Sequence, residues 1–127
     1  MNALTASRPA VIICTSNLAR ATAFYRDTLG LSLVTEDACA AVFDLAGTEL
    51  RVSLVAGFTP HEHTILGFRV PDVAAAVKAL RDHGVTFNTY ARFPHDDLGI
   101  VTLPGGATRV AWFQDPDGNV LSVTSLL

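Results

Sequence analysis

Histidine and carboxylate side chains cluster at two places in the sequence, residues 61–63 (His-Glu-His) and residues 95–97 (His-Asp-Asp). Imidazole nitrogens and carboxylate oxygens are common ligands of divalent metal ions, so each cluster offers donors for a metal site. The first cluster lies in a polar stretch with glycine and proline, residues 57–64, which is typical of a linker. We therefore favour the interpretation that both clusters are solvated loop ends, and we keep metal binding by their histidines as an alternative.

Polar side chains alternate with apolar ones in residues 48–54, which is the pattern of a strand with one buried face. Leu50, Val52 and Leu54 share the face that we expect to pack on a helix. By the same alternation, the predicted strands at residues 65–70 and 119–125 also have an open face, on the side of the sheet away from the helix. The candidate ligand-contacting side chains on these open faces are Glu49, Arg51, Ser53, Ile65, Gly67, Arg69 and Ser122.

Arginine and tryptophan carry most of the binding chemistry at these positions. The guanidinium group of Arg51 or Arg69 can hold a carboxylate or a phosphate through two parallel hydrogen bonds. The alternative is that either arginine pairs with Glu49 or another acid, or lies at an exposed rim. Trp112 or Phe113 can provide a flat apolar wall for an aromatic ligand. The pattern leaves open which of the two faces the ligand, and we include Trp112 among the candidate site residues.

Motifs of several other enzyme classes are absent from the sequence. There is no Gly-x-Ser-x-Gly nucleophile elbow, no phosphate-binding loop and no dinucleotide fingerprint. Tyr90 and His95 are expected near a loop, where either could carry a proton in an enzyme that uses no metal. The sequence itself identifies no catalytic residue.

The composition predicts one compact domain, because half of the 127 residues are hydrophobic and only 17% are charged. No apolar run approaches the roughly 18 residues that span a bilayer, and the N-terminus lacks the basic-then-apolar order of a secretion signal. We therefore expect a cytoplasmic protein that does not bind membranes. The net charge is −3 with scattered basic residues, so nucleic-acid binding is not expected. Cys14 and Cys39 lie in apolar stretches, where buried free thiols are expected in this compartment.

The predicted elements occur twice in the same order. In the first copy, Asn17 caps a helix that ends at Gly30. In the second copy, Asp72 and Gly84 take the corresponding places. Strands are predicted at residues 10–15, 31–35, 39–45, 48–55, 65–70, 86–91, 99–103, 108–114 and 119–125.

The two copies also align residue by residue, because the offset that pairs Asn17 with Asp72 also pairs Arg26 with Arg81. This self-similarity predicts an internal βαβββ duplication, with module 1 at residues 9–56 and module 2 at residues 64–127. One module cannot cover both faces of its sheet. The modules must therefore pack together or exchange across a dimer, with the helices on one face and a concave ligand cleft on the other.

Two stretches of the chain resemble motifs of the vicinal-oxygen-chelate superfamily, which includes glyoxalase I, extradiol dioxygenases and bleomycin-resistance proteins. One is residues 112–124, in which an Asp-Pro-Asp-Gly turn separates two apolar runs. The other is residues 16–31, in which a phenylalanine-tyrosine pair precedes a leucine-glycine step. The resemblance covers about residues 9–125. It implies an α+β fold, the glyoxalase/bleomycin-resistance fold, in which two tandem βαβββ modules form a curved, mostly antiparallel sheet with a concave cleft, as a single domain over residues 1–127.

The resemblance also implies where a metal would bind, since metal-using members carry a ligand on the first and the last strand of each module. In this sequence the four positions fall on Ala10, Arg51 or Ser53, Ile65, and Ser122. Alanine and isoleucine have no donor atom, a serine hydroxyl is a weak ligand, and a guanidinium group stays protonated. We therefore expect no metal and no other cofactor. A displaced site with His63 and Glu49 as ligands is the alternative.

These observations favour a small-molecule-binding protein without the metal site of the superfamily. Its ligand is expected to be anionic or aromatic, and a homodimer is expected because the resemblance implies paired modules and exposed sheet edges need covering. The alternative is a metal-dependent lyase, isomerase or dioxygenase of the same superfamily that uses a displaced site. A third possibility is a domain that acts only through protein contacts.

Overall fold

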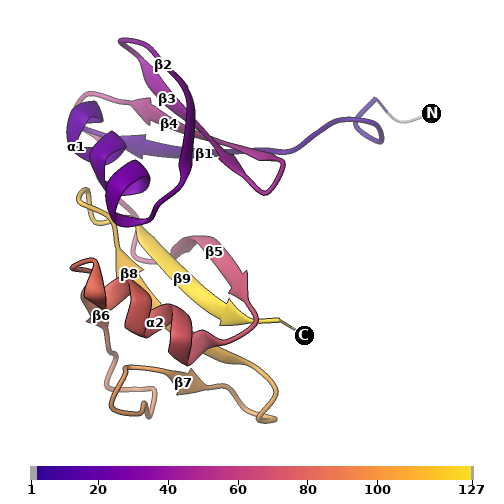
Figure 1. Cartoon of the computed structure of the whole chain (residues 1–127), viewed down its shortest axis with the longest axis vertical. Helices are drawn as coiled ribbons and strands as arrows, with labels where there is room; N and C mark the ends of the chain where they lie inside the picture. Colours follow the sequence, from indigo (N-terminus) through magenta and orange to yellow (C-terminus); the bar gives the residue numbers. More distant parts are fainter. Residues whose placement is uncertain (1–2, 127) are drawn as a thin grey trace. The chain divides into compact units, whose positions relative to one another are not determined.

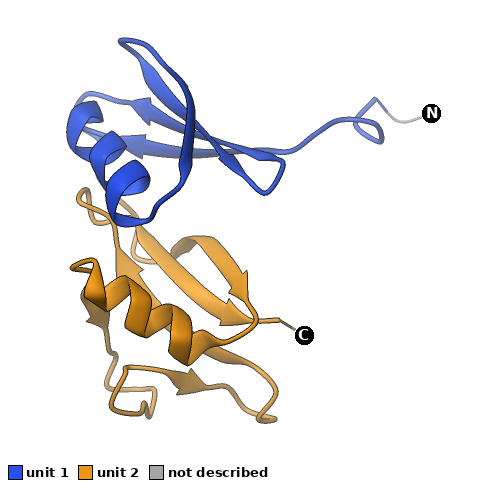
Figure 2. Cartoon of the chain, viewed as in Figure 1, with its two compact units in different colours: residues 1–58 blue, residues 59–127 orange. Residues whose placement is uncertain are grey.

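The computed structural model describes residues 3–126 and divides into two compact units, residues 1–58 and residues 59–127 (Figure 2). The elements of unit 1 are β1 (Ala10–Thr15), α1 (Leu18–Ala23), the π-helical turn η1 (Phe24–Thr28), β2 (Ser32–Glu36), β3 (Ala40–Leu45) and β4 (Thr48–Leu54). The elements of unit 2 are β5 (Thr64–Val70), α2 (Val73–Asp82), β6 (Phe87–Asn88), β7 (Val101–Thr102), β8 (Arg109–Gln114) and β9 (Val120–Ser125). Figure 1 labels them in the same way. This is the α+β architecture that the sequence predicts.

Unit 1 is a four-stranded sheet in the order β1-β4-β3-β2. Strand β1 runs parallel to β4, and the other pairs are antiparallel. The parallel pair requires a crossover, which α1 provides. Leu50 and Val52 of β4 are fully buried together with Phe43 of β3, so the alternation in β4 separates a core face from an open face as predicted. Leu54 is an exception, because its side chain is 44% exposed at the end of the strand.

Both helices begin at the predicted caps. The side-chain oxygen of Asn17 accepts a hydrogen bond from the Arg20 amide at 3.1 Å, and Asp72 accepts one from the Ala75 amide at 3.0 Å. Each bond satisfies an amide that has no partner within the helix. The first helix changes to a π-helical turn, in which the Leu29 amide donates to the Phe24 carbonyl at 2.9 Å. No residue pattern in this stretch predicts the change.

Unit 2 is a five-stranded sheet in the order β5-β9-β8-β6, and β7 pairs with β8 on the same edge as β6. Helix α2 packs on β8 and β9 (Figure 1). Strands β6 and β7 have two residues each, so they are much shorter than the strands predicted at residues 86–91 and 99–103. The reason is that a single edge strand along β8 is interrupted by an excursion, residues 89–100, that leaves the sheet between β6 and β7.

The structure tests the expectation about the cysteines. Neither Cys14 nor Cys39 forms a disulfide bond within residues 3–126, but the expected burial is wrong, because Cys14 is half-buried and Cys39 is exposed in the bend before β3. Among the helices of residues 3–126, none has both the length and the apolar composition of a membrane span.

Candidate functional site

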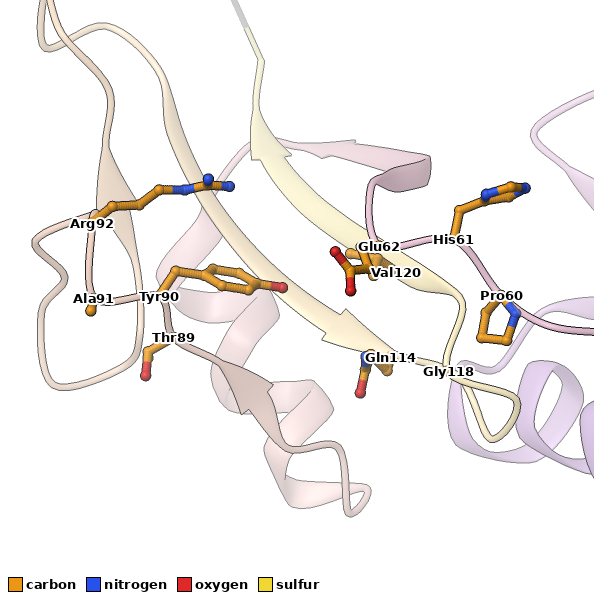
Figure 3. Close-up of a pocket in the computed structure, with 10 residues that line it drawn as sticks. All are labelled: Pro60, His61, Glu62, Thr89, Tyr90, Ala91, Arg92, Gln114, Gly118 and Val120. Carbon is orange, nitrogen blue, oxygen red and sulfur yellow. The ribbon is translucent and has the colours of Figure 1, made fainter.

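Two cavities of about 740 Å³ and about 250 Å³ adjoin each other in unit 2. They share the lining residues Glu62, Tyr90, Arg92 and Val120. Trp112 lines the smaller cavity. Gln114 lines the larger one, which Figure 3 shows. We refer to the two together as the unit 2 pocket.

The floor of the unit 2 pocket is the sheet face that points away from α2. Cross-strand pairing places Phe113 opposite Leu121, and both are buried in the core beneath α2. Because side chains alternate along a strand, the neighbouring positions face the other way. On that open face, Trp112 lies opposite Ser122 and Gln114 lies opposite Val120.

The excursion between β6 and β7 forms one wall of the pocket. It places the Tyr90 ring edge-on to Trp112 with 5.4 Å between the ring centroids, and the Phe93 ring at 5.5 Å from Trp112. The guanidinium carbon of Arg92 lies 5.1 Å from the centroid of the Phe93 ring, a cation–π contact. These contacts hold three side chains of the excursion over the open face of β8.

The β8–β9 hairpin is fixed by a buried carboxylate next to the pocket. Asp115 is 5% exposed and accepts hydrogen bonds from the Asp117 amide at 3.0 Å, the Asn119 amide at 2.9 Å and the Asn119 side-chain amide at 2.8 Å. Gly118 in this turn has a φ of +91°, and a Cβ there would lie 3.1 Å from Cγ of Pro60. The turn therefore supports the segment before β5 that carries Glu62.

Several polar side chains of the pocket have no hydrogen-bond or ion-pair partner in the part of the chain that the structure describes. Within residues 3–126, the side chains of Glu62, Tyr90, Arg92 and Gln114 make no hydrogen bond or ion pair, and Arg92 makes a cation–π contact with Phe93. Figure 3 shows the hydroxyl of Tyr90, the carboxylate of Glu62 and the guanidinium of Arg92 all projecting into the pocket. The pocket thus offers a carboxylate, a guanidinium cation, a phenol and an amide beside an aromatic wall.

The histidines of residues 61–63 take a different arrangement. His61 lines the larger cavity, but its ring points away from the other polar ends (Figure 3). It stacks on the ring of His63 with 5.2 Å between the centroids. The interplanar angle is 30°, and within residues 3–126 neither histidine belongs to a group of three side chains that could hold a metal ion.

The structure brings together only some of the residues that the sequence predicts to contact a ligand. Gly67 pairs with Ser122, and a Cβ on Gly67 would lie 3.1 Å from the Ser122 oxygen, so these two residues share the open face with Trp112. Arg69 lies two positions further along β5, exposed and outside the unit 2 pocket. Ile65 lies at a register shift between Thr64 and Leu66 and has no cross-strand partner.

The three remaining predicted residues, Glu49, Arg51 and Ser53, alternate along β4 in unit 1. Arg51 lies between Ile12 and Val42 on the open face of that sheet. No ion pair between Arg51 and Glu49 is formed in the described residues. Ligand contact by these residues stays a prediction.

Sequence reasoning did not select Glu62, Tyr90, Arg92 or Gln114 as ligand-contacting residues. The parity of β8 could have indicated Gln114, because it lies two residues after Trp112. The other side chains reach the pocket through the excursion and the segment before β5. No periodic pattern marks the direction in which such segments turn.

The positions that the superfamily resemblance assigns to a metal do not fit one. Ala10 presents a methyl group beside Glu49 of β4, Ile65 presents a hydrocarbon, and Ser122 is 4% exposed with only a hydroxyl. Among residues 3–126, no three His, Cys, Asp or Glu side chains lie close enough to hold a metal ion. The donor set therefore differs from the one that metal-using members require.

Comparison with known proteins places this chain in a family. Residues 8–123 match the model of the Glyoxalase/Bleomycin resistance protein/Dioxygenase superfamily, and the chain belongs to that superfamily. A search of curated protein sequences finds no match.

Solved structures with the same fold are distant in sequence. A glyoxalase/bleomycin resistance protein/dioxygenase from Alicyclobacillus acidocaldarius has a TM-score of 0.72 at 18% identity, covering 96% of this chain and 92% of its own. A lactoylglutathione lyase from Agrobacterium tumefaciens has a TM-score of 0.72 at 18% identity, covering 94% of this chain and 93% of its own. The fosfomycin resistance protein FosX from Listeria monocytogenes has a TM-score of 0.72 at 14% identity, covering 96% of this chain and 94% of its own.

Proposed function

We propose that this chain is a small-molecule-binding protein of the superfamily that works without the metal site used by other members. The observation that carries the proposal is the unit 2 pocket, in which an aromatic wall and unpartnered polar groups adjoin. A volume of about 740 Å³ suits an organic molecule of ordinary size. The absence of donors at Ala10 and Ile65 supports binding without a metal.

The chemistry of the pocket supports a ligand that is anionic or aromatic. Arg92 offers a planar guanidinium group that can bind a carboxylate or phosphate in a bidentate way. Trp112, with Phe93 and Tyr90 packed against it, offers an apolar surface that an aromatic ring can cover. Binding of this kind needs shape, apolar contact and a few polar anchors, so a sequestering role requires no catalytic residue.

The intrinsic fluorescence of the protein gives a direct test, because Trp112 is the only tryptophan. A ligand that enters the unit 2 pocket should change the emission of Trp112 and raise the melting temperature. We expect both responses for some members of a screen of aromatic acids and antibiotics. Arg92→Gln should weaken the response, and Arg69→Gln should leave it unchanged, since Arg69 lies outside the pocket. A flat response throughout the screen would refute the proposal.

The second candidate is a metal-dependent lyase, isomerase or dioxygenase that uses a displaced site. The observation that favours it is the presence of His61 and Glu62 in the lining of the larger cavity. Metal analysis of protein purified without chelator separates the two candidates. Stoichiometric metal that is lost in His63→Ala would support the enzyme, and a metal content near zero would support the binding protein.

The location, oligomeric state and partners of the protein form part of the same proposal. We propose a cytoplasmic homodimer whose partner is a small molecule, with no nucleic-acid or membrane partner. The open sheet faces and edges of each unit support dimerisation, because strand edges with unpaired amides are normally covered. Light scattering coupled to size-exclusion chromatography tests it, and a mass of one 13.5 kDa chain would contradict it.

A further inference from the structure

The unit 2 pocket contains one carboxylate, on Glu62, and one guanidinium group, on Arg92, which do not pair with each other. Glu62 and Arg92 line both cavities, and within residues 3–126 neither forms an ion pair. They come from different segments, Glu62 from the stretch before β5 and Arg92 from the excursion between β6 and β7. Figure 3 shows them approaching the pocket from different sides.

The two unpaired charges influence which ligand charge the pocket favours. A ligand that is only an anion gains attraction from Arg92 but meets repulsion from Glu62 in the same pocket, and a ligand that is only a cation meets the reverse. A ligand that carries both charges satisfies both groups. Specificity of this kind uses repulsion of the wrong partner as well as attraction of the right one.

The surface between the two charges is aromatic and apolar. Val120 lines both cavities between the segments that carry Glu62 and Arg92, and Trp112 with Tyr90 lines the smaller one. The rings of Tyr90 and Phe93 are already fixed against Trp112 by ring contacts at 5.4 and 5.5 Å. A flat ring bound there buries apolar surface without the cost of ordering the wall.

On this basis we propose that the pocket selects a zwitterionic aromatic molecule, with an ammonium or other cationic group toward Glu62 and a carboxylate or other anionic group toward Arg92. The inference rests on the proposed function and names the class of its ligand. Because the two protein groups approach from different sides, the charges of the ligand lie at opposite ends of its ring. An α-amino acid, which carries both charges on one carbon, fits less well.

Four probes test this inference by calorimetric titration, with Trp112 emission as a second readout. They are 4-(aminomethyl)benzoate, which has both charges at opposite ends, 4-methylbenzoate, 4-methylbenzylamine and phenylalanine. Exposed charge pairs are screened by water, so we expect each contact to contribute about a two- to fivefold change in affinity. The 4-(aminomethyl)benzoate should bind more tightly than the other three probes, and added salt should reduce its advantage.

Two substitutions test which protein side chain binds each charged group of the ligand. Glu62→Gln should remove the advantage of 4-(aminomethyl)benzoate over 4-methylbenzoate while leaving 4-methylbenzoate binding intact or improved. Arg92→Gln should remove the affinity advantage of 4-(aminomethyl)benzoate over 4-methylbenzylamine. The matched controls are Glu36→Gln and Arg69→Gln, which change an exposed acid and an exposed arginine that line neither cavity. The Glu62 carboxylate forms no hydrogen bond or ion pair within residues 3–126, so Glu62→Gln should fold normally even if Arg92→Gln loosens the excursion.

The outcomes separate this inference from the proposed function. Equal affinity for the singly charged probes and the zwitterion, or equal effects of Glu62→Gln and Glu36→Gln, overturns the inference. If none of the four probes binds while another compound in the broad screen does, the ligand class is wrong and the binding function stands. If nothing in either set binds, the binding function itself fails.

Discussion

The contact between Gly118 and Pro60 gives the sharpest test of how the β8–β9 hairpin supports the unit 2 pocket. Gly118→Ala adds a methyl group at a φ of +91°, where an L residue is strained by about 1–2 kcal/mol. The new Cβ would also lie 3.1 Å from Cγ of Pro60, closer than ordinary van der Waals contact. Overpacking in a core costs about 1–3 kcal/mol, and we expect about 1 kcal/mol here because Pro60 lies in a loop.

Gly84 provides the matched control for this prediction. It has the same φ of +91° in the same unit, and a Cβ there would have nothing within 4 Å. Gly84→Ala therefore carries the backbone strain alone, and Gly118→Ala carries the strain and the contact. We expect Gly118→Ala to be less stable than Gly84→Ala by about 1 kcal/mol, a difference of about 3–5 °C in melting temperature for a chain of this size.

Calorimetry and urea denaturation measure the difference between the two variants. The contact should also displace the segment that carries Glu62, so Gly118→Ala should weaken binding of any pocket ligand and Gly84→Ala should not. Adding Pro60→Ala to Gly118→Ala removes the crowded atom and should recover part of the lost stability. Equal stability of the two glycine variants would refute this reasoning, because their backbone strain is the same.

Three further predictions concern other parts of the structure. Asp115→Ala removes the acceptor of three hydrogen bonds, two of them buried and donated by Asn119, and should cost about 3 kcal/mol in urea denaturation; a loss below about 1 kcal/mol would contradict the role given to this carboxylate. Phe93→Ala removes a ring that covers Trp112, so the emission of Trp112 should shift to longer wavelength and stability should fall by about 1 kcal/mol, whereas unchanged emission would argue against the contact. Hydrogen bonds from the Cys39 and Ala40 amides hold the pKa of Asp37 below its usual value, so its stabilising effect is present above the unfolded pKa and is lost as the pH falls through the folded pKa. The stability advantage of the wild type over Asp37→Ala should therefore shrink below about pH 4, and an advantage that stays constant down to pH 2 would contradict this.

Local signals in the sequence predicted the elements of the fold well. Asn17 and Asp72 cap their helices because a short polar side chain before an apolar helical pattern satisfies the first free amides. The alternation in β4 predicted which side chains are buried, since a strand places neighbours on opposite faces. The predicted lengths of β6 and β7 were wrong, because pairing with β8 and not local composition decides where an edge strand ends.

The candidate site was predictable only where it lies on regular strands. Gly67, Trp112 and Ser122 share an open face because their parity and pairing place them there. The alternation of side chains along the strand left open whether Trp112 or Phe113 faces the ligand. The choice came from the tertiary structure, in which Phe113 packs against Phe87 and Leu121 beneath α2.

The sequence by itself indicated a protein with the paired βαβββ modules of this superfamily. Through the resemblance, it also predicts hydrocarbon side chains at two of the positions where metal-using members bind their ion. Both follow from residue types at fixed spacing, which need no knowledge of distant contacts. The tertiary structure alone decided that Glu62, Tyr90 and Arg92 line one pocket. The physical reason is that the excursion is held by ring contacts to Trp112, a residue more than twenty positions from Tyr90 along the chain. Contacts over such separations depend on how the whole sheet pairs, and no local pattern of residues encodes them.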